Sequence, residues 1–448
     1  MNSLWYDAAA EATSQHRTNG MLYRLDGGRA RALVAGAMVL SFLLASTAAV
    51  RPWVAQWRGS GAPLDRAARR ALSIEPGNDR FRVVLASLYH YSLLLRDYPA
   101  ALAFYQSALR SNPLDSASWL HLGKLYQKLD RPREADRALG LAVRLAPSDA
   151  TLLWEATLAY LEEGRLPAAL STLARFISIS RDENARTAGY DLAHRIAPPD
   201  EVLRSIIEPG VTPYAKYVNY LLDGNRADEA FRVWRRIKEI PAGVDERVDP
   251  NLQLRAVDLL MAKGQFGAAH EVWRSLMKEI DPEVALHGSN LISNASFERR
   301  DTLGRGFDWR IGGAAGIECD IDASTAFAGR QSLRVSFGKS QAEFSNVYQV
   351  TPVQAGSMYT LEAHIRTRGL DGSPGVTVEV IDPPTGLLAR TQTVAGTRDW
   401  TKVGVTFRTS SKTEAVTVRV HSEPAAPSSI QRSAATAWID DVSLTKAH

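Results

Sequence analysis

The chain has 448 residues, enough for two or three domains, and its 45% hydrophobic and 23% charged residues are typical of packed domains, not of a disordered chain. Its formal net charge of +4 is small for this length, and the basic residues form no dense block, which argues against nucleic acid as the main partner. Cys319 is the only cysteine, so the chain can form no internal disulfide and no cysteine-based zinc site.

The first distinctive element is an uncharged apolar run at residues 32–50. The run is about as long as a membrane-spanning helix, and Trp53 and Trp57 follow it where an interfacial aromatic belt would lie. We predict a retained transmembrane helix here, preceded by a cytoplasmic tail at residues 1–28 that is expected to be disordered. The alternative is a cleaved signal peptide, since residues 46–49 are small enough for a peptidase. The long remainder contains no second span and should therefore lie on the extracytoplasmic side.

Residues 116–147 predict a pair of antiparallel helices. Small residues at two positions let the helices approach closely, and large apolar residues fill the space between them and toward neighbouring hairpins. The residues are Trp119, Leu122, Gly123, Tyr126, Ala135, Leu139, Ala142 and Pro147. This set resembles the tetratricopeptide pattern W-x2-L-G-x2-Y…A-x3-F…P, with Leu139 in the aromatic slot. Because such a unit cannot bury its apolar face alone, the resemblance implies further repeats on both sides.

The same spacing recurs along the chain. Ala101 lies 34 residues before Ala135, the period expected for this repeat. The turn of that earlier repeat carries about three extra residues before Pro99. Residues 184–208 predict two short helices broken at Pro198 and Pro199, and two more helix pairs follow, with Gly224 and Gly264 near their turns. We therefore predict an all-α, tetratricopeptide-like solenoid of five or six hairpins over residues 62–282.

In tetratricopeptide repeats the first helices line a groove that takes an extended peptide or a partner helix, and the resemblance implies the same here. The implied protein-binding residues are Val83, Ser87, His90, Leu120, Lys124, Gln127 and Trp154. The alternative is that these residues tie adjacent hairpins together or face solvent.

After residue 290 the helical period gives way to alternation. Residues 332–337, 359–365, 376–380, 402–407 and 416–420 alternate apolar and polar side chains between Gly, Pro and Asp, which predicts an antiparallel β-sandwich over residues 290–446. The opening segment 290–298, Trp309, the run 328–335, Gly356, the segment 399–401 and the closing segment 438–444 occur in the order found in carbohydrate-binding modules of the jelly-roll, galactose-binding-like type. This part of the chain resembles that family.

The resemblance implies a structural calcium ion near the two ends of the sandwich. Its ligands would be Glu298 and Asp440 or Asp441, whose oxygens suit a hard cation. The alternative is that these acids are solvated or pair with Arg330. Glycan binding would need an exposed aromatic ring, and the candidates are Trp309, Tyr348 and Trp400. The alternative for each ring is a place in the core.

The sequence contains no H-E-x-x-H, G-x-S-x-G or G-x-G-x-x-G motif, and its nine histidines show no ligand spacing. We therefore expect a non-enzymatic scaffold of a bacterial cell envelope, held in the inner membrane by one helix with its bulk in the periplasm. It would bind protein through the repeats and polysaccharide through the sandwich, in surface-polysaccharide assembly or export. The alternatives are a glycan-processing or glycan-transferring enzyme with its catalytic residues at 181–213, and a purely protein-interaction adaptor with a structural sandwich.

Overall fold

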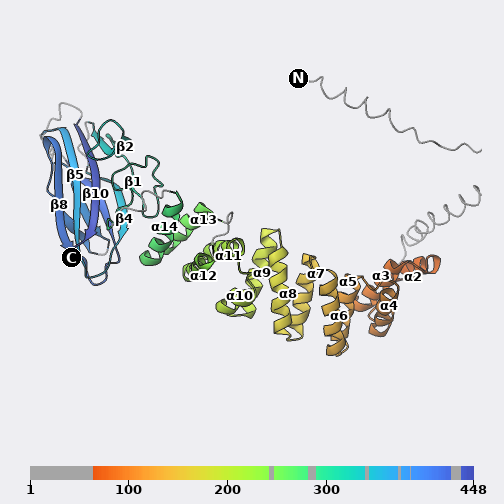
Figure 1. Cartoon of the computed structure of the whole chain (residues 1–448). Helices are drawn as coiled ribbons and strands as arrows, with labels where there is room; N and C mark the ends of the chain where they lie inside the picture. Colours follow the sequence, from red (N-terminus) through yellow and green to blue (C-terminus); the bar gives the residue numbers. More distant parts are fainter. Residues whose placement is uncertain are drawn as a thin grey trace, which may run out of the picture. The chain divides into compact units, whose positions relative to one another are not determined.

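The computed structural model describes residues 64–241, 247–280, 289–338, 343–371, 375–383, 385–424 and 435–447. The chain forms two compact units, Met1–Thr172 and Leu173–His448, and Figure 1 labels their helices and several of their strands. Among the helices in these ranges, none is both long and apolar enough to cross a bilayer. The predicted transmembrane helix at 32–50 and the predicted tail at 1–28 lie outside the described residues.

The first unit is built from helical hairpins. Its helices are α2 (Leu64–Ile74), α3 (Asp79–Tyr91), α4 (Tyr98–Ser111), α5 (Ser116–Lys128), α6 (Pro132–Leu145), α7 (Ala150–Glu162) and the beginning of α8 (Leu166–Ile179). Two of these helices have an aspartate as N-cap. At α4 the Asp97 carboxylate accepts a hydrogen bond from the Ala100 N–H, and at α7 the Asp149 carboxylate accepts one from the Leu152 N–H.

The hairpin predicted at 116–147 is present as α5 and α6. A Cβ atom at Gly123 would lie 2.7 Å from the Leu139 side chain, so glycine sets how closely the two helices approach. Ala135, Leu139 and Ala142 are fully buried between them. The helical hairpins are therefore confirmed, while their membership of the tetratricopeptide family stays a prediction.

The second unit continues the helices and ends in the sandwich. After the end of α8 its helices are α9 (Glu183–Ile196), α10 (Pro199–Ser205), α11 (Val211–Asp223), α12 (Ala227–Glu239), α13 (Pro250–Ala262) and α14 (Phe266–Ile280). The predicted break at Pro198 and Pro199 separates α9 from α10. Gly264 has the expected left-handed backbone, with φ +74°, but Gly224 has φ −79° and Asn225 takes the left-handed position instead, with φ 56°.

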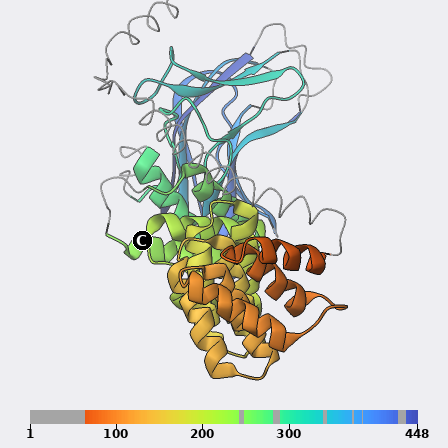
Figure 2. The same ribbon diagram turned by 90° about the vertical axis from the view of Figure 1, so that its right-hand side faces the viewer.

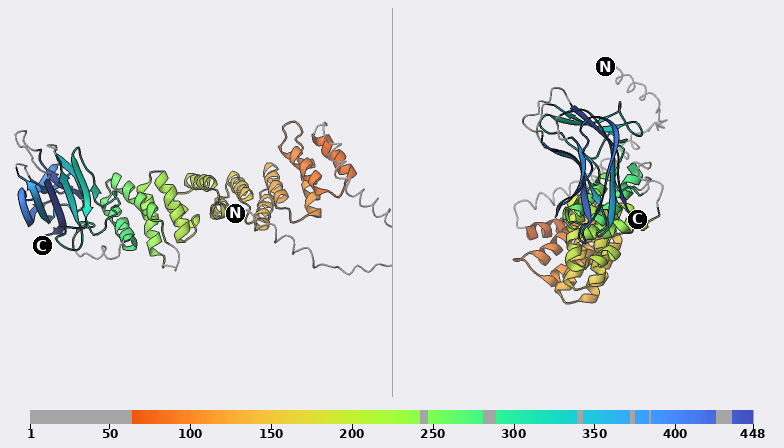
Figure 3. Two further views of the ribbon diagram at one scale, coloured as in Figure 1. Left: turned by 90° about the horizontal axis from the view of Figure 1, so that it is seen from above. Right: turned by 90° about the vertical axis from the view of Figure 1, so that its left-hand side faces the viewer.

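The sandwich consists of two five-stranded antiparallel sheets, as the alternating strands predicted. One sheet has the order β1-β4-β9-β6-β7 and the other β2-β3-β10-β5-β8, and the two layers can be followed in Figure 3. The strands are β1 (Arg310–Ile311), β2 (Ile317–Asp322), β3 (Ser332–Phe337), β4 (Phe344–Pro352), β5 (Met358–Leu370), β6 (Thr377–Asp382), β7 (Gly386–Arg390), β8 (Gly396–Arg408), β9 (Ala415–Ser422) and β10 (Ala435–Lys446).

A loop of the sandwich, residues 299–309, packs on the last helical hairpin; we call it the docking loop. Phe307 is 2% exposed and meets the rings of His270 on α14 at 5.4 Å and Trp273 at 6.1 Å, both edge to face. The Arg305 Nε donates to Asp258 on α13 at 2.9 Å. The helical hairpin and the sandwich are thus joined by a buried aromatic contact with an ion pair beside it.

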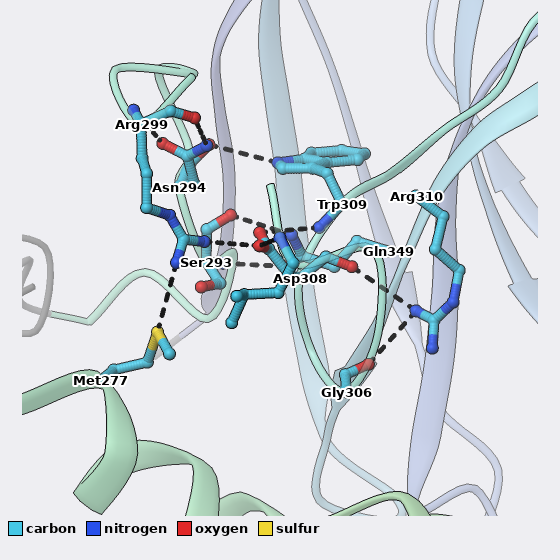
Figure 4. Close-up of polar contacts among 10 residues, drawn as sticks. Met277, Ser293, Asn294, Arg299, Gly306, Asp308, Trp309, Arg310 and Gln349 are labelled. Carbon is cyan, nitrogen blue, oxygen red and sulfur yellow. Dashed lines mark hydrogen bonds and ion pairs between the residues drawn. The ribbon is translucent and has the colours of Figure 1, made fainter. Parts of the chain in front are cut away.

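Asp308 fixes the shape of the docking loop from inside (Figure 4). Its carboxylate is fully buried and accepts hydrogen bonds from the Arg299 guanidinium at 2.6 Å and from the Leu303 and Trp309 N–H groups at 2.7 and 2.9 Å. A buried carboxylate needs such partners, because desolvation disfavours its charged form. The sequence of the loop therefore determines how Phe307 is presented to the helices.

Candidate functional site

The outer face of the sheet β1-β4-β9-β6-β7 carries the most organised set of polar side chains in the sandwich. On β9, Val416, Val418 and Val420 point into the core, so Arg419 and His421 point outward. The strand register then aligns five outward residues across the whole sheet, each opposite the next. This cross-strand row is Arg310, Tyr348, Arg419, Glu379 and Arg390.

Glu379 lies inside the row and has no exposed side-chain surface. The Arg419 Nε donates to one of its carboxylate oxygens at 2.8 Å, and the Arg390 Nε donates to the other at 2.6 Å. Charge-assisted hydrogen bonds of this kind fix both guanidinium planes. The two arginine side chains remain 29% and 38% exposed, so part of each guanidinium still faces solvent in a defined orientation.

Further polar groups extend the row along the strands. The His421 ring forms a hydrogen bond through Nδ1 with the Ser345 hydroxyl at 2.8 Å, and its Nε2 lies 3.4 Å from Glu423. The adjacent His421 ring and a hydrogen bond from Arg390 lower the pKa of the Glu423 carboxyl. The face therefore offers cations and carboxylates held in place by one another.

Tyr348 is the aromatic member of the row. It is partly exposed, and the Arg310 guanidinium lies over its ring, 5.5 Å from the centroid. A flat ring next to oriented N–H donors is the combination with which proteins bind sugars, since the ring covers C–H groups and the donors reach hydroxyls. The row therefore brings together the types of group that contact a polyhydroxylated ligand, which would displace the guanidinium in order to stack on the ring face that Arg310 covers.

The other two predicted aromatic candidates do not join Tyr348. Trp309 is fully buried, packs on Phe297 at 5.1 Å and donates through Nε1 to the Asn294 carbonyl. It is a core residue, and its ring cannot serve as a sugar platform. Trp400 lies on β8 in the opposite sheet, where it meets Phe327, a residue that the sequence analysis did not single out.

The predicted calcium ligands partly meet at one loop, residues 325–331. Glu298 Oε1 accepts the N–H groups of Arg330 and Gln331 at 2.6 and 3.0 Å, so it is the backbone of Arg330 that Glu298 binds. Asp440 Oδ2 accepts the N–H groups of Phe327 and Ala328 at 2.7 and 3.1 Å. The third predicted ligand, Asp441, lies with its carboxylate 3.4 Å from the ring of His364.

Backbone N–H groups bind both carboxylate oxygens of Asp440. The residue is fully buried, no basic side chain in the described part of the chain forms an ion pair with it, and burial raises its pKa to about 6. Calcium binding by Glu298 and Asp440 stays a prediction, and the Asp441 carboxylate lies beside His364 instead. The described residues include no group of three or more acidic, histidine or cysteine side chains arranged for a metal.

The predicted groove residues of the helical hairpins mostly contact neighbouring helices. Lys124 pairs with Glu155 on α7 at 2.6 Å, and Gln127 donates to the Ala159 carbonyl on the same helix. The remaining side chains are partly or fully packed. Leu120 and His90 are each 4% exposed, Ser87 shares a hydrogen bond with the Tyr105 hydroxyl at 3.2 Å, and Val83 and Trp154 are half-buried. Lys124 and Gln127 thus link adjacent hairpins, and a protein-binding groove at these seven positions stays a prediction.

Sequence reasoning missed four of the five residues in the row, all of them charged. A signal was present for Glu379, because a charged residue in the alternating run 376–380 must point outward. Its partners Arg390 and Arg419 come from strands elsewhere in the sequence, and only the register of three strands brings them together.

Comparison with known proteins shows which kind of domain the sandwich resembles. Residues 289–428 match the family model described as a carbohydrate binding domain. The C-terminal part of the chain is therefore a β-sandwich domain like a carbohydrate-binding module. A search of curated proteins returned no match.

Solved structures of carbohydrate-binding modules are similar to this part of the chain. TmCBM61 in complex with β-1,4-galactotriose is 17% identical, with 36% of this chain and 100% of that chain covered and a TM-score of 0.26. A CBM4 module is 18% identical, with 35% and 99% covered and a TM-score of 0.26. The CBM22-1 xylan-binding domain of Paenibacillus barcinonensis Xyn10C is 16% identical, with 34% and 91% covered and a TM-score of 0.23.

Proposed function

We propose that this protein is a membrane-anchored, non-enzymatic scaffold of a bacterial cell envelope whose sandwich binds glycan. The observation that carries the proposal is the cross-strand row, in which one partly exposed aromatic ring lies beside guanidinium groups fixed by the buried Glu379. The match of residues 289–428 to a carbohydrate binding domain supports the same function.

The remaining parts of the proposal concern the helices and the N-terminus. Stacked helical hairpins offer large surfaces to protein partners, and we assign this role to the tetratricopeptide-like region. The apolar run at 32–50 would hold the chain in the inner membrane, with the bulk in the periplasm and the glycan being a surface polysaccharide under assembly or export. A calcium ion held by Glu298 and Asp440 would stabilise the sandwich without taking part in chemistry.

Glycan binding is tested with the purified full chain on a glycan array and on immobilised polysaccharides. Tyr348→Ala removes the ring from the row, and we expect it to abolish retention of any glycan that the natural chain retains. Tyr348→Phe keeps the ring and should retain most of the binding. Trp400→Ala is the matched control, because this aromatic lies on the other sheet. Retention of no glycan by the natural chain, or equal loss with Trp400→Ala, would refute the assignment.

A further inference from the structure

The turn between α3 and α4, residues 92–97, differs from the other turns that close a hairpin; we call it the leucine loop. It has six residues, whereas the turns at 129–131, 163–165, 224–226 and 263–265 have three each. Leu93 is 83% exposed and Leu94 is 94% exposed, more than the other large hydrophobic residues of the described chain. The loop extends away from the helices of the first unit (Figure 2).

Nothing in the fold of the hairpin needs these two side chains. Asp97 caps α4, the Asp97 N–H donates to the Tyr89 carbonyl, and Leu95 packs against the core of the first hairpins. The ends of the loop are therefore fixed by the fold, and its tip holds a pair of leucines in water. Exposed apolar pairs at a loop tip are typical of contacts with another apolar surface.

The position of the loop relative to α2 suggests which surface that is. α2 and α3 are antiparallel: the turn at 75–78 joins the end of α2 to the start of α3, and the Arg69 Nε donates to the Tyr89 hydroxyl at 3.0 Å. The beginning of α2 therefore lies at the same end of the hairpin as the leucine loop. Residues 51–63 connect this end to the apolar run at 32–50 and can reach at most about 45 Å.

Charge also suits a lipid surface at this end of the hairpin. Arg66 in the first turn of α2 and Arg96 in the leucine loop are both exposed; of the carboxylates at this end, Asp97 caps α4 and Asp65 beside Arg66 is half-buried. Basic side chains next to exposed leucines are the usual composition of a segment that lies in the interface of an anionic bilayer.

We propose that the leucine loop is a second membrane contact, in which Leu93 and Leu94 enter the interface of an anionic bilayer beside the anchoring run. The proposal rests on the membrane anchor of the proposed function. Two contacts at one end of the first hairpin would fix its orientation to the membrane and leave the opposite end, with the turn at 112–115, turned away.

The test uses the full chain reconstituted in vesicles of phosphatidylcholine and phosphatidylglycerol. A fluorophore is attached at Leu94→Cys, and for comparison at Leu114→Cys, because Leu114 is also exposed, at 72%, but lies at the other end of α4. The natural chain provides the labelling blank, since burial raises the pKa of Cys319 to about 12. Quenchers attached to lipid and dissolved in water report where each probe lies.

We expect the lipid quencher to act several-fold more strongly on the probe at 94 than on the probe at 114, and the added substitution Leu93→Asp to return the probe at 94 to water. If the chain floats with the vesicles while both probes behave alike, the second contact is refuted and the anchor stands. If the chain does not float with the vesicles, the anchor and the second contact are both refuted. Circular dichroism of each variant confirms that the helices are intact.

Discussion

Phe307→Ala is the substitution that tests most directly whether the last hairpin and the sandwich form one body. The side chain is 2% exposed between His270 and Trp273, so its removal leaves a cavity where the docking loop meets α14. Truncation of a buried phenylalanine costs about 3 to 5 kcal/mol. We expect the lower end, about 3 kcal/mol, because a contact between a loop and a helix can relax more than a closed core.

That cost should appear as local opening between α14 and the docking loop, since each 1.4 kcal/mol is about a tenfold change in an equilibrium constant. The expected rise in the opening equilibrium is roughly a hundredfold. Hydrogen exchange of the full chain should show faster exchange in α14 and in residues 299–309, with the strands of the sandwich unchanged. Phe327→Ala is the control, because Phe327 is 45% exposed on the same domain. Exchange in α14 at the natural rate would refute the docking contact.

Three further predictions concern stability. Differential scanning calorimetry at neutral pH should show a higher melting temperature for the sandwich with calcium than with a chelator. Glu298→Ala should remove this difference. Equal melting temperatures of the natural chain under the two conditions would exclude the ion. Burial lowers the pKa of His90 to about 4, so as the pH decreases from 6.5 to 4 the imidazole takes up a proton in the unfolded chain first, and the free energy of unfolding falls by up to about 3 kcal/mol. Denaturant unfolding of His90→Phe should show a flatter pH dependence. An unchanged pH dependence would contradict the burial argument. Trp309→Ala should cost about 3 to 5 kcal/mol in sandwich stability, and a change below 1 kcal/mol would place its ring outside the core.

The elements that sequence could predict are those whose signal is local. The hairpin of α5 and α6 was predictable because Trp119, Leu122, Gly123 and Tyr126 lie at helical spacing in one helix and Ala135, Leu139 and Ala142 do so in the next. The strands were predictable from apolar residues at alternate positions, such as Val416, Val418 and Val420. In both cases the side chains that form the core lie within one short segment, so their spacing alone shows which face is buried.

The candidate site was much harder to predict, because its members come from five strands. Tyr348 could be identified as an aromatic residue of suitable size, but the same reasoning selected Trp309, which lies in the core, and Trp400, which lies on the other sheet. Outward position follows from strand parity, whereas the neighbours of an outward residue follow from strand order. The order β1-β4-β9-β6-β7 joins strands that are far apart in sequence, and no local pattern encodes it.

A hydrogen bond links the docking loop to the cross-strand row. Arg310, the first residue of the row, donates through Nη1 to the Gly306 carbonyl of the docking loop at 3.2 Å (Figure 4). Gly306 has φ +59°, and a Cβ atom there would lie 2.7 Å from the Trp273 ring, so the loop reaches α14 only because this residue is glycine. The contact that holds the helices against the sandwich therefore also positions the guanidinium over Tyr348.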